Sequence, residues 1–408
     1  MRKTDPRSSS FGPTQKPSIV STHGSLLFLY MVPETGHQKA AEAIIASASH
    51  MDPRVESVGV DAGRNTYPWI GSVINRMYLQ MLKRAPFIWE YLYDNPDVEE
   101  ATRDARGLLT FLTSFRMKRL IRRYRPVAVV CTQAAPATAV AAEKRRGHLP
   151  VPLVCVVTDF GVHQYWIHPE VDLYLVAHED VKQEMVRRGI EEDRIRVTGI
   201  PIDPKFGETM DQLEARRRLR LNPSRQTILL MGGSQGLGSL DELAESLKTL
   251  PMDVQIIAIA GRNRSLYRKL VDVGAGESDF HVFGYVKDLA PVMSAADILI
   301  TKPGGLTCSE ALARQLPLVL TNPIPGQEER NVRFLTTHQA ARIVRSQEDL
   351  LHTVSDLLRH PKKLTAMRQR AKLISKPFSS WEAARLIFDL VNKRGPFAPR
   401  RTSGPLPR

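Results

Sequence analysis

Short apolar runs alternate with longer helical patterns through most of the chain. Each run is four to seven residues long, the length of a strand buried on both faces, and helical patterns lie between many of them. The predicted strands cover 26–32, 127–132, 153–158, 172–177, 227–231, 254–260, 280–283, 297–301 and 318–321. Strands separated by helices predict parallel sheets with crossover helices, so we expect an α/β fold.

The chain divides into two α/β halves of similar size. Its 408 residues suffice for about two domains, and the stretch "TGIPIDPKFGE", 198–208, marks the seam between them. The predicted division is 1–24 as a disordered segment, 25–205 as the first domain, 206–374 as the second, 375–394 as an amphipathic helix and 395–408 as a disordered basic tail. That helix could close the second half or cross back to pack on the first.

The charge balance predicts an anionic partner. The chain carries 57 Lys and Arg against 43 Asp and Glu, a net charge of +14. Aromatic residues are sparse and we find no nucleic-acid-binding motif, which favours an acidic membrane surface over nucleic acid. No apolar run approaches the roughly 18 residues of a membrane span. Cys131 and Cys155 lie in apolar runs typical of buried thiols, so we expect a soluble or peripheral protein in a reducing compartment.

Two neighbouring segments are unusually rich in basic and aromatic residues. They are "YPWIGSVINRMYLQMLKRAPFIWEYLYD", 67–94, and "FRMKRLIRRYR", 115–125. Basic, aromatic, amphipathic helices are typical of association with a membrane surface. The alternative is a helix packed on the sheet whose Arg stems reach along apolar surface to water.

Three glycine-containing loops follow strands in the second half. They contain Gly232, Gly233 and Ser234; then Gly261, Arg262 and Asn263; then Pro303, Gly304, Gly305 and Thr307. Ligands of open α/β sheets bind at the carboxyl ends of strands, so three such loops favour a phosphate or nucleotide site. Their spacing matches neither a P-loop nor a dinucleotide fingerprint.

The last loop, "TKPGGLTCSEA", 301–311, admits two interpretations. Thr307 and Glu310 could form a capping box that satisfies two N–H groups at the start of a helix. Alternatively, the turn and the bare helix N-terminus form an anion site. Just beyond it, Gln327, Glu328 and Asn331 cluster at a turn, where amide and carboxylate groups could read sugar hydroxyls. Glu328 could equally be an ordinary helix-start charge.

The first half offers candidate acid–base residues. His37 lies where a strand turns into a helix, and a helix N-terminus disfavours the cationic form, so this histidine could accept a proton or could be purely structural. Asp159, His163, Trp166 and His168 directly follow another strand. They could be metal ligands, but no closing Cys or His pair has zinc spacing and the chain has no Asp-x-Asp, so we predict no metal and no cofactor.

Several of these motifs together resemble the diacylglycerol glycosyltransferases of glycosyltransferase family 28, the monogalactosyl- and glucosyl-diacylglycerol synthases. The resemblance covers about 26–392 and is carried by "GHQKAAEAI", "TDFGVHQYWIHPEVDLYLV", "GGSQG", "AGRN", "FGYV" and above all "LITKPGGLTCSEALARQLPLVLTNPIPGQEERN". It implies a GT-B fold, in which two Rossmann-like domains face each other across a cleft and the C-terminal helix crosses back. It also implies an inverting, metal-independent transfer of a hexose from a UDP-sugar to the hydroxyl of diacylglycerol.

The resemblance also implies residue roles. His37 would lie at the catalytic centre with Asp159 on the acceptor side, and Glu310 would hold the ribose hydroxyls. The residues expected to bind the UDP-sugar are Gly232, Gly233, Ser234, Arg262, Asn263, Tyr285, Val286, Pro303, Gly304, Gly305, Leu306, Thr307, Glu310, Gln327, Glu328 and Asn331. The residues expected on the acceptor and membrane side are His163, Trp166, Trp69, Arg76, Tyr78 and Trp89. The loop before His37, "PETGH", has one glycine where many relatives are glycine-rich.

The expected partners are UDP-glucose or UDP-galactose, diacylglycerol and anionic lipids at the cytoplasmic face of the cell membrane. The sequence does not distinguish the two sugars, the number of sugars added, the oligomeric state, or which of His37 and Asp159 is the base. One alternative is the lipid-linked GlcNAc transferase of peptidoglycan synthesis, which has a similar "GGSQG" stretch. Another is a UDP-sugar epimerase on the same fold, which would need no membrane.

Overall fold

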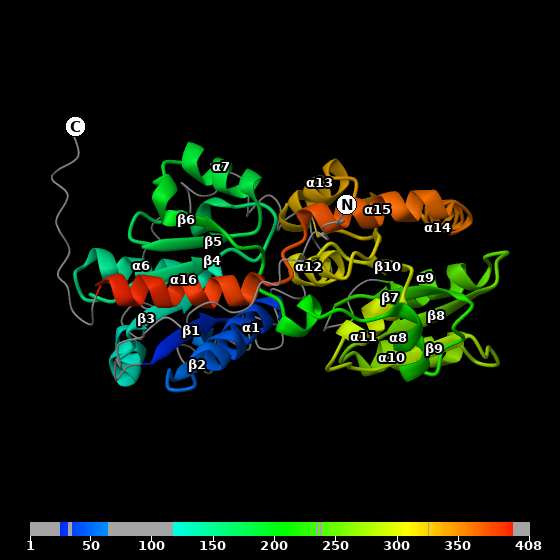
Figure 1. The fold of residues 1–408 in the computed structure, drawn as a ribbon, viewed down its shortest axis with the longest axis horizontal. Coiled ribbons are helices and arrows are strands. Elements are labelled where there is room, and N and C mark those ends of the chain that lie inside the picture. The colour runs from blue at the N-terminus through cyan, green and yellow to red at the C-terminus, as the bar shows by residue number, and fades with distance from the viewer. Residues whose placement is uncertain are drawn as a thin grey trace, which may run out of the picture.

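The protein folds into two α/β domains, each built on a parallel sheet. The computed structural model describes residues 25–31, 35–63, 117–233, 236, 239–324 and 326–394. The two six-stranded sheets lie in separate lobes side by side (Figure 1), with strand orders β2-β1-β3-β4-β5-β6 and β12-β11-β10-β7-β8-β9. Every pairing within them is parallel, which confirms the predicted fold class.

The strands of the two sheets follow the chain in order. The first sheet contains β1 (Leu26–Tyr30), β2 (Ser57–Asp61), β3 (Ala128–Cys131), β4 (Leu153–Val156), β5 (Leu173–Val176) and β6 (Ile195–Val197). The second contains β7 (Gln226–Met231), β8 (Val254–Ile259), β9 (Phe280–Phe283), β10 (Ile298–Thr301), β11 (Leu318–Leu320) and β12 (Ala341–Ile343).

Helices connect these strands and cover both sheets. In the first half they are α1 (Gly36–Met51), α6 (Ala134–Arg145) and α7 (Glu179–Arg187), with a further helical stretch over 117–124. In the second half they are α8 (Gln212–Arg218), α9 (Leu240–Lys248), α10 (Arg264–Val273), α11 (Ala290–Ala295), α12 (Gly305–Ala313), α13 (Gln327–Thr337), α14 (Gln347–Arg359), α15 (Pro361–Ile374) and α16 (Ser379–Arg394). Short 3₁₀ turns lie at η1 (Gln164–Trp166), η2 (Glu192–Arg194) and η3 (Pro204–Gly207).

Burial on both faces explains why the strands are continuous apolar runs. Alternate residues of β1 belong to different clusters: Leu27 and Leu29 pack with α6 and α7, whereas Leu26 and Phe28 pack with α1 and α16. The nine predicted strands are all present. The three strands that the prediction missed, β2, β6 and β12, are edge strands whose sequences mix polar and apolar residues, because one side of an edge strand meets solvent.

The last helix crosses back to the first domain, as predicted. Figure 1 shows α16 lying beside α1 and the first sheet, although it follows the whole second domain in the sequence. Ala383, Ala384, Ile387 and Phe388 are buried in the same cluster as β1. The C-terminal helix therefore completes the core of the first domain.

The two connections between the domains pack against each other. The Ser379 hydroxyl donates a hydrogen bond to Ile200 O over 2.8 Å and accepts one from Ile202 N over 3.3 Å. Gly199 has φ +86°, and a Cβ there would lie 2.3 Å from Lys376 Cβ. A side chain at Gly199 would therefore push the outgoing and returning chains apart.

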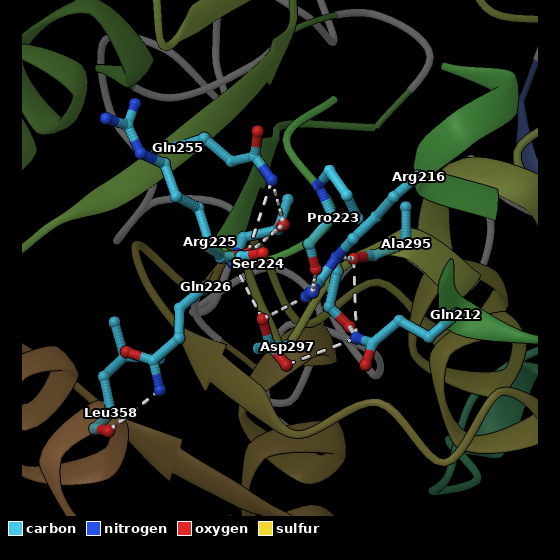
Figure 2. Close-up of polar contacts among 12 residues, drawn as sticks. Gln212, Arg216, Pro223, Ser224, Arg225, Gln226, Gln255, Ala295, Asp297 and Leu358 are labelled. Atoms are coloured by element: carbon cyan, nitrogen blue, oxygen red, sulfur yellow. Dashed lines mark hydrogen bonds and ion pairs between the residues drawn. The ribbon is translucent and has the colours of Figure 1, made fainter. Parts of the chain in front are cut away.

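A buried polar network closes the amino end of the second sheet (Figure 2). Arg216 of α8 forms an ion pair with Asp297 over 2.6 Å, and Asp297 also accepts a hydrogen bond from Thr227 N over 2.7 Å. Gln212 donates to Ala296 O over 2.9 Å. These bonds hold α8 to the starts of β7 and β10, so the polar groups at this end serve the fold, whereas the candidate site lies at the opposite, carboxyl end.

Two predictions about the surface and the thiols have different outcomes. Cys131, Cys155 and Cys308 are free and buried, as expected for the first two. Within the described residues, none of the helices combines the length and the apolar character that a membrane span requires. The segment 67–94, predicted to contact a membrane, lies outside the described residues. The helical stretch 117–124 buries Met117, Leu120 and Ile121.

Candidate active site between the two domains

The candidate site forms where the carboxyl ends of strands from both sheets meet. The first domain contributes the start of α1 and the loop after β4, and the second contributes the loop after β10 and the start of α13. Gly36 at the start of α1 lies against Leu306 at the start of α12: a Cβ on Gly36 would lie 3.4 Å from Leu306 Cβ. Two helix N-termini, each with a positive dipole end, therefore meet at this interface.

His37 is held in one orientation by the first domain. Its Nδ1 lies 2.9 Å from Thr132 O and 2.9 Å from Thr158 Oγ1, and the Thr132 hydroxyl donates to His37 O over 2.9 Å. A carbonyl oxygen can only accept, so Nδ1 carries the hydrogen and the lone pair is on Nε2. Burial lowers the pKa of His37, while the Asp159 carboxylate and the Thr132 carbonyl partly offset that effect. His37 is thus a neutral imidazole at neutral pH.

Asp159 and Asn331 join the two domains. The Asn331 amide on α13 donates to Asp159 Oδ1 over 3.0 Å and to Pro303 O over 2.9 Å, and it accepts from Phe160 N over 2.7 Å. Asn331 is 0% exposed. The predicted role of Asn331 was to read a sugar; the structure instead buries its side chain between the acceptor-side loop and the glycine loop of the second domain.

The start of α12 tests the capping-box interpretation of the loop 301–311. The helix begins at Gly305 with Gly304 as its N-cap, and no side chain makes a capping hydrogen bond. Thr307 is therefore inside the helix and Glu310 lies in its second turn, so the capping-box interpretation is wrong. A Cβ on Gly305 would lie 2.2 Å from Thr158 O, so glycine is required for the close approach of α12 to the first domain.

Glu310 is a buried carboxyl group whose desolvation is offset only by the charge of Lys39. Burial raises its pKa to about 8, the Asp203 carboxylate adds to the rise, and Lys39 opposes it. In the described part of the chain its side chain makes no hydrogen bond or ion pair. Glu310 is 9% exposed, and its oxygens are not among the described side-chain atoms that are both fully buried and without a partner, so a ligand could reach them.

Glu328 is positioned by two contacts in the first turn of α13. Its Oε1 lies 3.1 Å from Lys302 Nζ and its Oε2 accepts from Ile324 N over 2.7 Å. Burial raises the pKa of Glu328, and Lys302 works in the opposite direction. Glu328 is therefore both a helix-start residue and a buried, oriented carboxylate. Gln327 begins the same helix.

The predicted nucleotide-side residues surround the end of the second sheet. The Arg262 guanidinium stacks 4.2 Å from the centroid of the Tyr285 ring. The Asn263 side chain caps α10 by accepting from Leu266 N over 3.0 Å and also donates to Gly236 O over 3.3 Å, so it mainly shapes the loop. Val286 and Leu306 are half-buried against the core of the second domain.

Other predicted site residues lie in the core of a domain or outside the residues that the structure describes. Trp166 is 2% exposed and packs in the first-domain core, so it cannot present its ring to a membrane or an acceptor. Burial, and then the charge of Arg330, lower the pKa of His163 to about 3, and its Nδ1 accepts from Tyr165 N over 3.2 Å. Gly232 and Gly233 follow β7. The predictions for Ser234, Trp69, Arg76, Tyr78 and Trp89 lie outside the described residues.

Sequence reasoning missed three residues of this site. Thr132 and Thr158 orient His37, and Lys302 pairs with Glu328. Each directly follows a strand or lies within two residues of its carboxyl end. That position is the feature of the sequence from which these residues could have been predicted. None of the predicted site residues belongs to a group that could hold a metal within the described chain.

Two family models match consecutive parts of the chain. Residues 37–202 match the family described as monogalactosyldiacylglycerol (MGDG) synthase, and residues 227–381 match the glycosyltransferase family 28 C-terminal domain. The first match covers β2 to β6 and the second covers the second sheet from Thr227 onward, and together they include His37, Asp159, Glu310 and Asn331.

Curated proteins similar to this chain share one name. A processive diacylglycerol beta-glucosyltransferase of Bacillus licheniformis is 29% identical over 355 residues, covering 86% of this chain and 91% of that protein. Proteins of the same name from Bacillus pumilus and Bacillus cereus are 34% identical over 267 residues and 36% identical over 264 residues. Those alignments cover 65% and 64% of this chain, and 69% and 67% of the respective relatives.

Solved structures share the fold at low sequence identity. MurG of Acinetobacter baumannii has a TM-score of 0.58 at 14% identity, covering 91% of this chain and 99% of that one. MnaA of S. aureus with UDP has a TM-score of 0.60 at 12% identity, covering 90% and 97%. Anabaena HepE with UDP-glucose has a TM-score of 0.55 at 13% identity, covering 90% and 100%. These likenesses support the predicted GT-B architecture.

Proposed function

The chain belongs to the family of monogalactosyldiacylglycerol synthases and processive diacylglycerol glucosyltransferases, and from this premise we propose that it transfers a hexose from a UDP-sugar to the hydroxyl of diacylglycerol. We propose UDP-glucose or UDP-galactose as the donor, inversion at the anomeric carbon, and no metal in the chemical step. The product is a membrane glycolipid.

The observation that carries this proposal is the fixed, neutral His37 beside the N-terminus of α12. Contacts to Thr132 O and Thr158 Oγ1 leave the Nε2 lone pair as the basic site of the ring. Burial keeps the imidazole neutral, and the nearby Asp159 carboxylate stabilises the imidazolium once a proton arrives. The ring therefore has the protonation state and orientation that a general base needs.

The chemical step uses both sides of the interface. The acceptor hydroxyl oxygen forms a bond to the anomeric carbon and its proton passes to His37 Nε2, while the bond from that carbon to the β-phosphate oxygen of UDP breaks. The developing negative charge on UDP is stabilised by the N–H groups and dipole at the start of α12. Opposite faces for attack and departure give inversion.

The donor is held by the second domain in this proposal. Glu310 accepts hydrogen bonds from the two ribose hydroxyls, the glycine turn at Gly304 and Gly305 binds the diphosphate, and Glu328 faces the sugar. Glu328 suits that role because Lys302 and Ile324 N fix its carboxylate. Because helix dipoles and lysine charge supply the positive potential, no metal is needed.

The first domain carries a feature that suits a membrane. The helical stretch 117–124 buries its apolar residues and exposes Arg119, Arg122 and Arg123, with Arg125 exposed directly after it. Clustered basic side chains attract anionic lipid. We propose that this surface brings the site to the cytoplasmic face of the cell membrane.

The experiment that tests the function uses the full chain with diacylglycerol vesicles and each UDP-sugar in turn, followed by separation of the lipids. We expect a glycosyl-diacylglycerol with one or both donors, in buffer containing a metal chelator. An assay with UDP-GlcNAc and no lipid runs in parallel. Epimerised UDP-sugar without any glycolipid would contradict the proposal, and so would loss of transfer on addition of the chelator under conditions in which the melting temperature of the protein is unchanged.

A further inference from the structure

A cluster of two histidines and one aspartate spans the domain interface away from His37. His178 is the N-cap of α7, just after β5 of the first domain, and Asp180 is in the first turn of the same helix. His338 is the C-cap of α13 in the second domain. One ligand atom from each residue lies within 4.8 Å of the others, and this is the one such group of three within the described chain.

The spacing within the cluster is close to that of metal ligands. His178 Nδ1 lies 3.4 Å from Asp180 Oδ2, and the two imidazole rings are 5.0 Å apart in a T-shaped arrangement. Tetrahedral zinc with bonds of about 2.0–2.2 Å holds neighbouring ligand atoms about 3.4 Å apart. The aspartate and His178 have that separation, but His178 Nδ1 also accepts a hydrogen bond of 3.3 Å from Asp180 N, so zinc at this atom would replace that capping bond of α7.

His338 is held in the tautomer that a metal requires. Its Nδ1 lies 2.9 Å from Phe334 O, so Nδ1 carries the hydrogen and Nε2 has the lone pair. The Phe334 ring packs against both histidines, 4.8 Å from His178 and 4.4 Å from His338. A histidine whose other nitrogen donates to a backbone carbonyl is the usual arrangement of a metal ligand.

We propose that His178, Asp180 and His338 form a zinc-binding site that ties the two domains together, with water as the fourth ligand. Two imidazoles and one carboxylate suit zinc better than magnesium or calcium, which prefer oxygen ligands. The Asp180 side chain is 67% exposed, so an ion and a water can reach the site. This site is separate from the chemical step and does not rest on the proposed function.

The position of the site gives it a mechanical consequence. The same helix, α13, carries Glu328 and Asn331 near its start and ends at His338. Asn331 holds the start of α13 to the first domain through Asp159 and Phe160. Zinc at His338 would hold its other end to α7, so the bound ion would stabilise the closed arrangement of the domains.

The test is a calorimetric titration of the full, metal-free chain with zinc chloride. We expect one equivalent to bind, and we expect His338→Ala and His178→Asn each to weaken binding at least tenfold. His178→Asn keeps a side chain that can cap α7. Because the two histidines come from different domains, equal losses would show that the ion bridges them. Magnesium chloride should give no binding in the same titration.

Control variants keep this test decisive. His352→Ala removes an exposed histidine of the second domain outside the cluster and should leave zinc binding unchanged. Zinc should raise the melting temperature of the wild type and of His352→Ala but not that of the two cluster variants. The variants' melting temperatures without zinc show whether they are folded. Zinc affinity that is unchanged in either cluster variant, or no binding to the wild type, would overturn the proposal.

Discussion

His37 and Glu310 are ionisable residues near the starts of helices that face each other, His37 half-buried and Glu310 buried, and their surroundings differ. The first domain surrounds His37 with hydrogen-bond partners, which fix its tautomer. The second domain leaves Glu310 without a hydrogen-bond partner among the described residues, and burial raises its pKa to about 8. Burial thus makes both groups neutral near neutral pH, but only His37 has its orientation determined by the protein.

This difference separates a residue prepared for chemistry from one prepared for binding. A general base must already hold its lone pair in place before the acceptor arrives. A carboxylate that accepts two ribose hydroxyls is completed only when the nucleotide is bound, and its unfavourable burial in the free protein is offset at that moment. The following experiments test whether the two residues really differ in this way.

Replacing His37 should give the largest effect. Loss of general-base catalysis lowers turnover by about 10²-fold or more, so we expect His37→Ala to lose at least that much kcat on saturating lipid. UDP affinity should stay near that of the wild type, because the residue serves the acceptor. Lipid glycosylation and calorimetric UDP titration measure the two quantities.

His50→Ala is the matched control, since His50 lies in the last turn of the same helix. Asp159→Asn should resemble His37→Ala in direction, because Asp159 stabilises the charged imidazolium. Near-normal turnover in His37→Ala would make that histidine a structural residue and would remove the proposed base.

Glu310→Gln should affect binding rather than the chemical step. An amide cannot fully replace a carboxylate that accepts from two hydroxyls, and a lost hydrogen bond to a charged group costs about 1.5–3 kcal/mol, or about ten- to a hundredfold in affinity. We therefore expect UDP and UDP-sugar to bind at least about tenfold more weakly at slightly alkaline pH. Glu329→Gln, at an exposed position of α13, is the control.

Thermal melting separates binding from folding for the same variant. The folded protein holds a proton on Glu310 that the unfolded chain releases, so the free energy of unfolding falls as pH rises from the ordinary Glu pKa toward about 8. Glu310→Gln lacks this fall and should melt at or above the wild-type temperature at alkaline pH. Unchanged UDP affinity in this variant would contradict the ribose role.

The pH dependence of UDP binding tests whether Glu310 binds the ribose as an ionised carboxylate. If the ionised carboxylate binds the ribose, affinity rises as the pH passes through the Glu310 pKa of about 8 and becomes level about one pH unit above it. About a tenth of the groups are ionised one pH unit below the pKa, so affinity should increase about tenfold between pH 7 and 9. The terminal phosphate of UDP titrates near pH 6 and adds little in this range. Glu310→Gln should show a flat profile.

Asn331→Ala should have a smaller effect, and on stability more than on affinity. The substitution removes the acceptor of Phe160 N, and an unsatisfied buried N–H costs about 1–3 kcal/mol; it also removes one hydrogen bond to Asp159 Oδ1. We expect a lower melting temperature, a modest fall in kcat through displaced Asp159, and unchanged UDP affinity. Asn392→Ala on the exposed side of α16 is the control. A higher KM for the UDP-sugar at normal stability would instead assign Asn331 to the donor sugar.

Added salt should give the smallest effect, confined to the lipid. Each basic side chain near an anionic surface contributes about 1 kcal/mol, and salt near 0.1 M screens charges over about 10 Å. Activity should therefore rise with anionic lipid content. The apparent KM of the enzyme for lipid should increase with salt, while its UDP affinity remains unchanged. Equal binding to neutral and anionic vesicles, indifferent to salt, would contradict the membrane role.

The central strands were predictable because burial on both faces leaves little choice of residue. Of the four edge strands only β9 was predicted; β2, β6 and β12 were not, since one side of each meets solvent and their sequences lose the apolar run. His37 could be recognised as a candidate because its position follows a strand directly. The partners that fix its tautomer, Thr132 and Thr158, lie about a hundred residues away, at positions that only the folded sheet brings together.

The interface was the least predictable part of the site. Nothing in the local sequence of α13 shows that Asn331 bonds to the first domain, because that contact depends on how the two sheets are placed. The capping-box interpretation failed for a related reason. Gly305 starts α12 three residues earlier than that pattern required, and its close approach to Thr158 O explains why the helix begins with glycine.

The return of α16 to the first domain also has a consequence for biosynthesis. Residues near the end of the chain complete the hydrophobic cluster around β1, so the first domain cannot finish folding when its own strands have left the ribosome. It must wait, with part of one sheet face uncovered, until the second domain and the last helix have been made. The first domain of such a protein can complete its core only after α16 has been synthesised. A chain whose synthesis stops earlier would expose apolar surface that chaperones and proteases recognise.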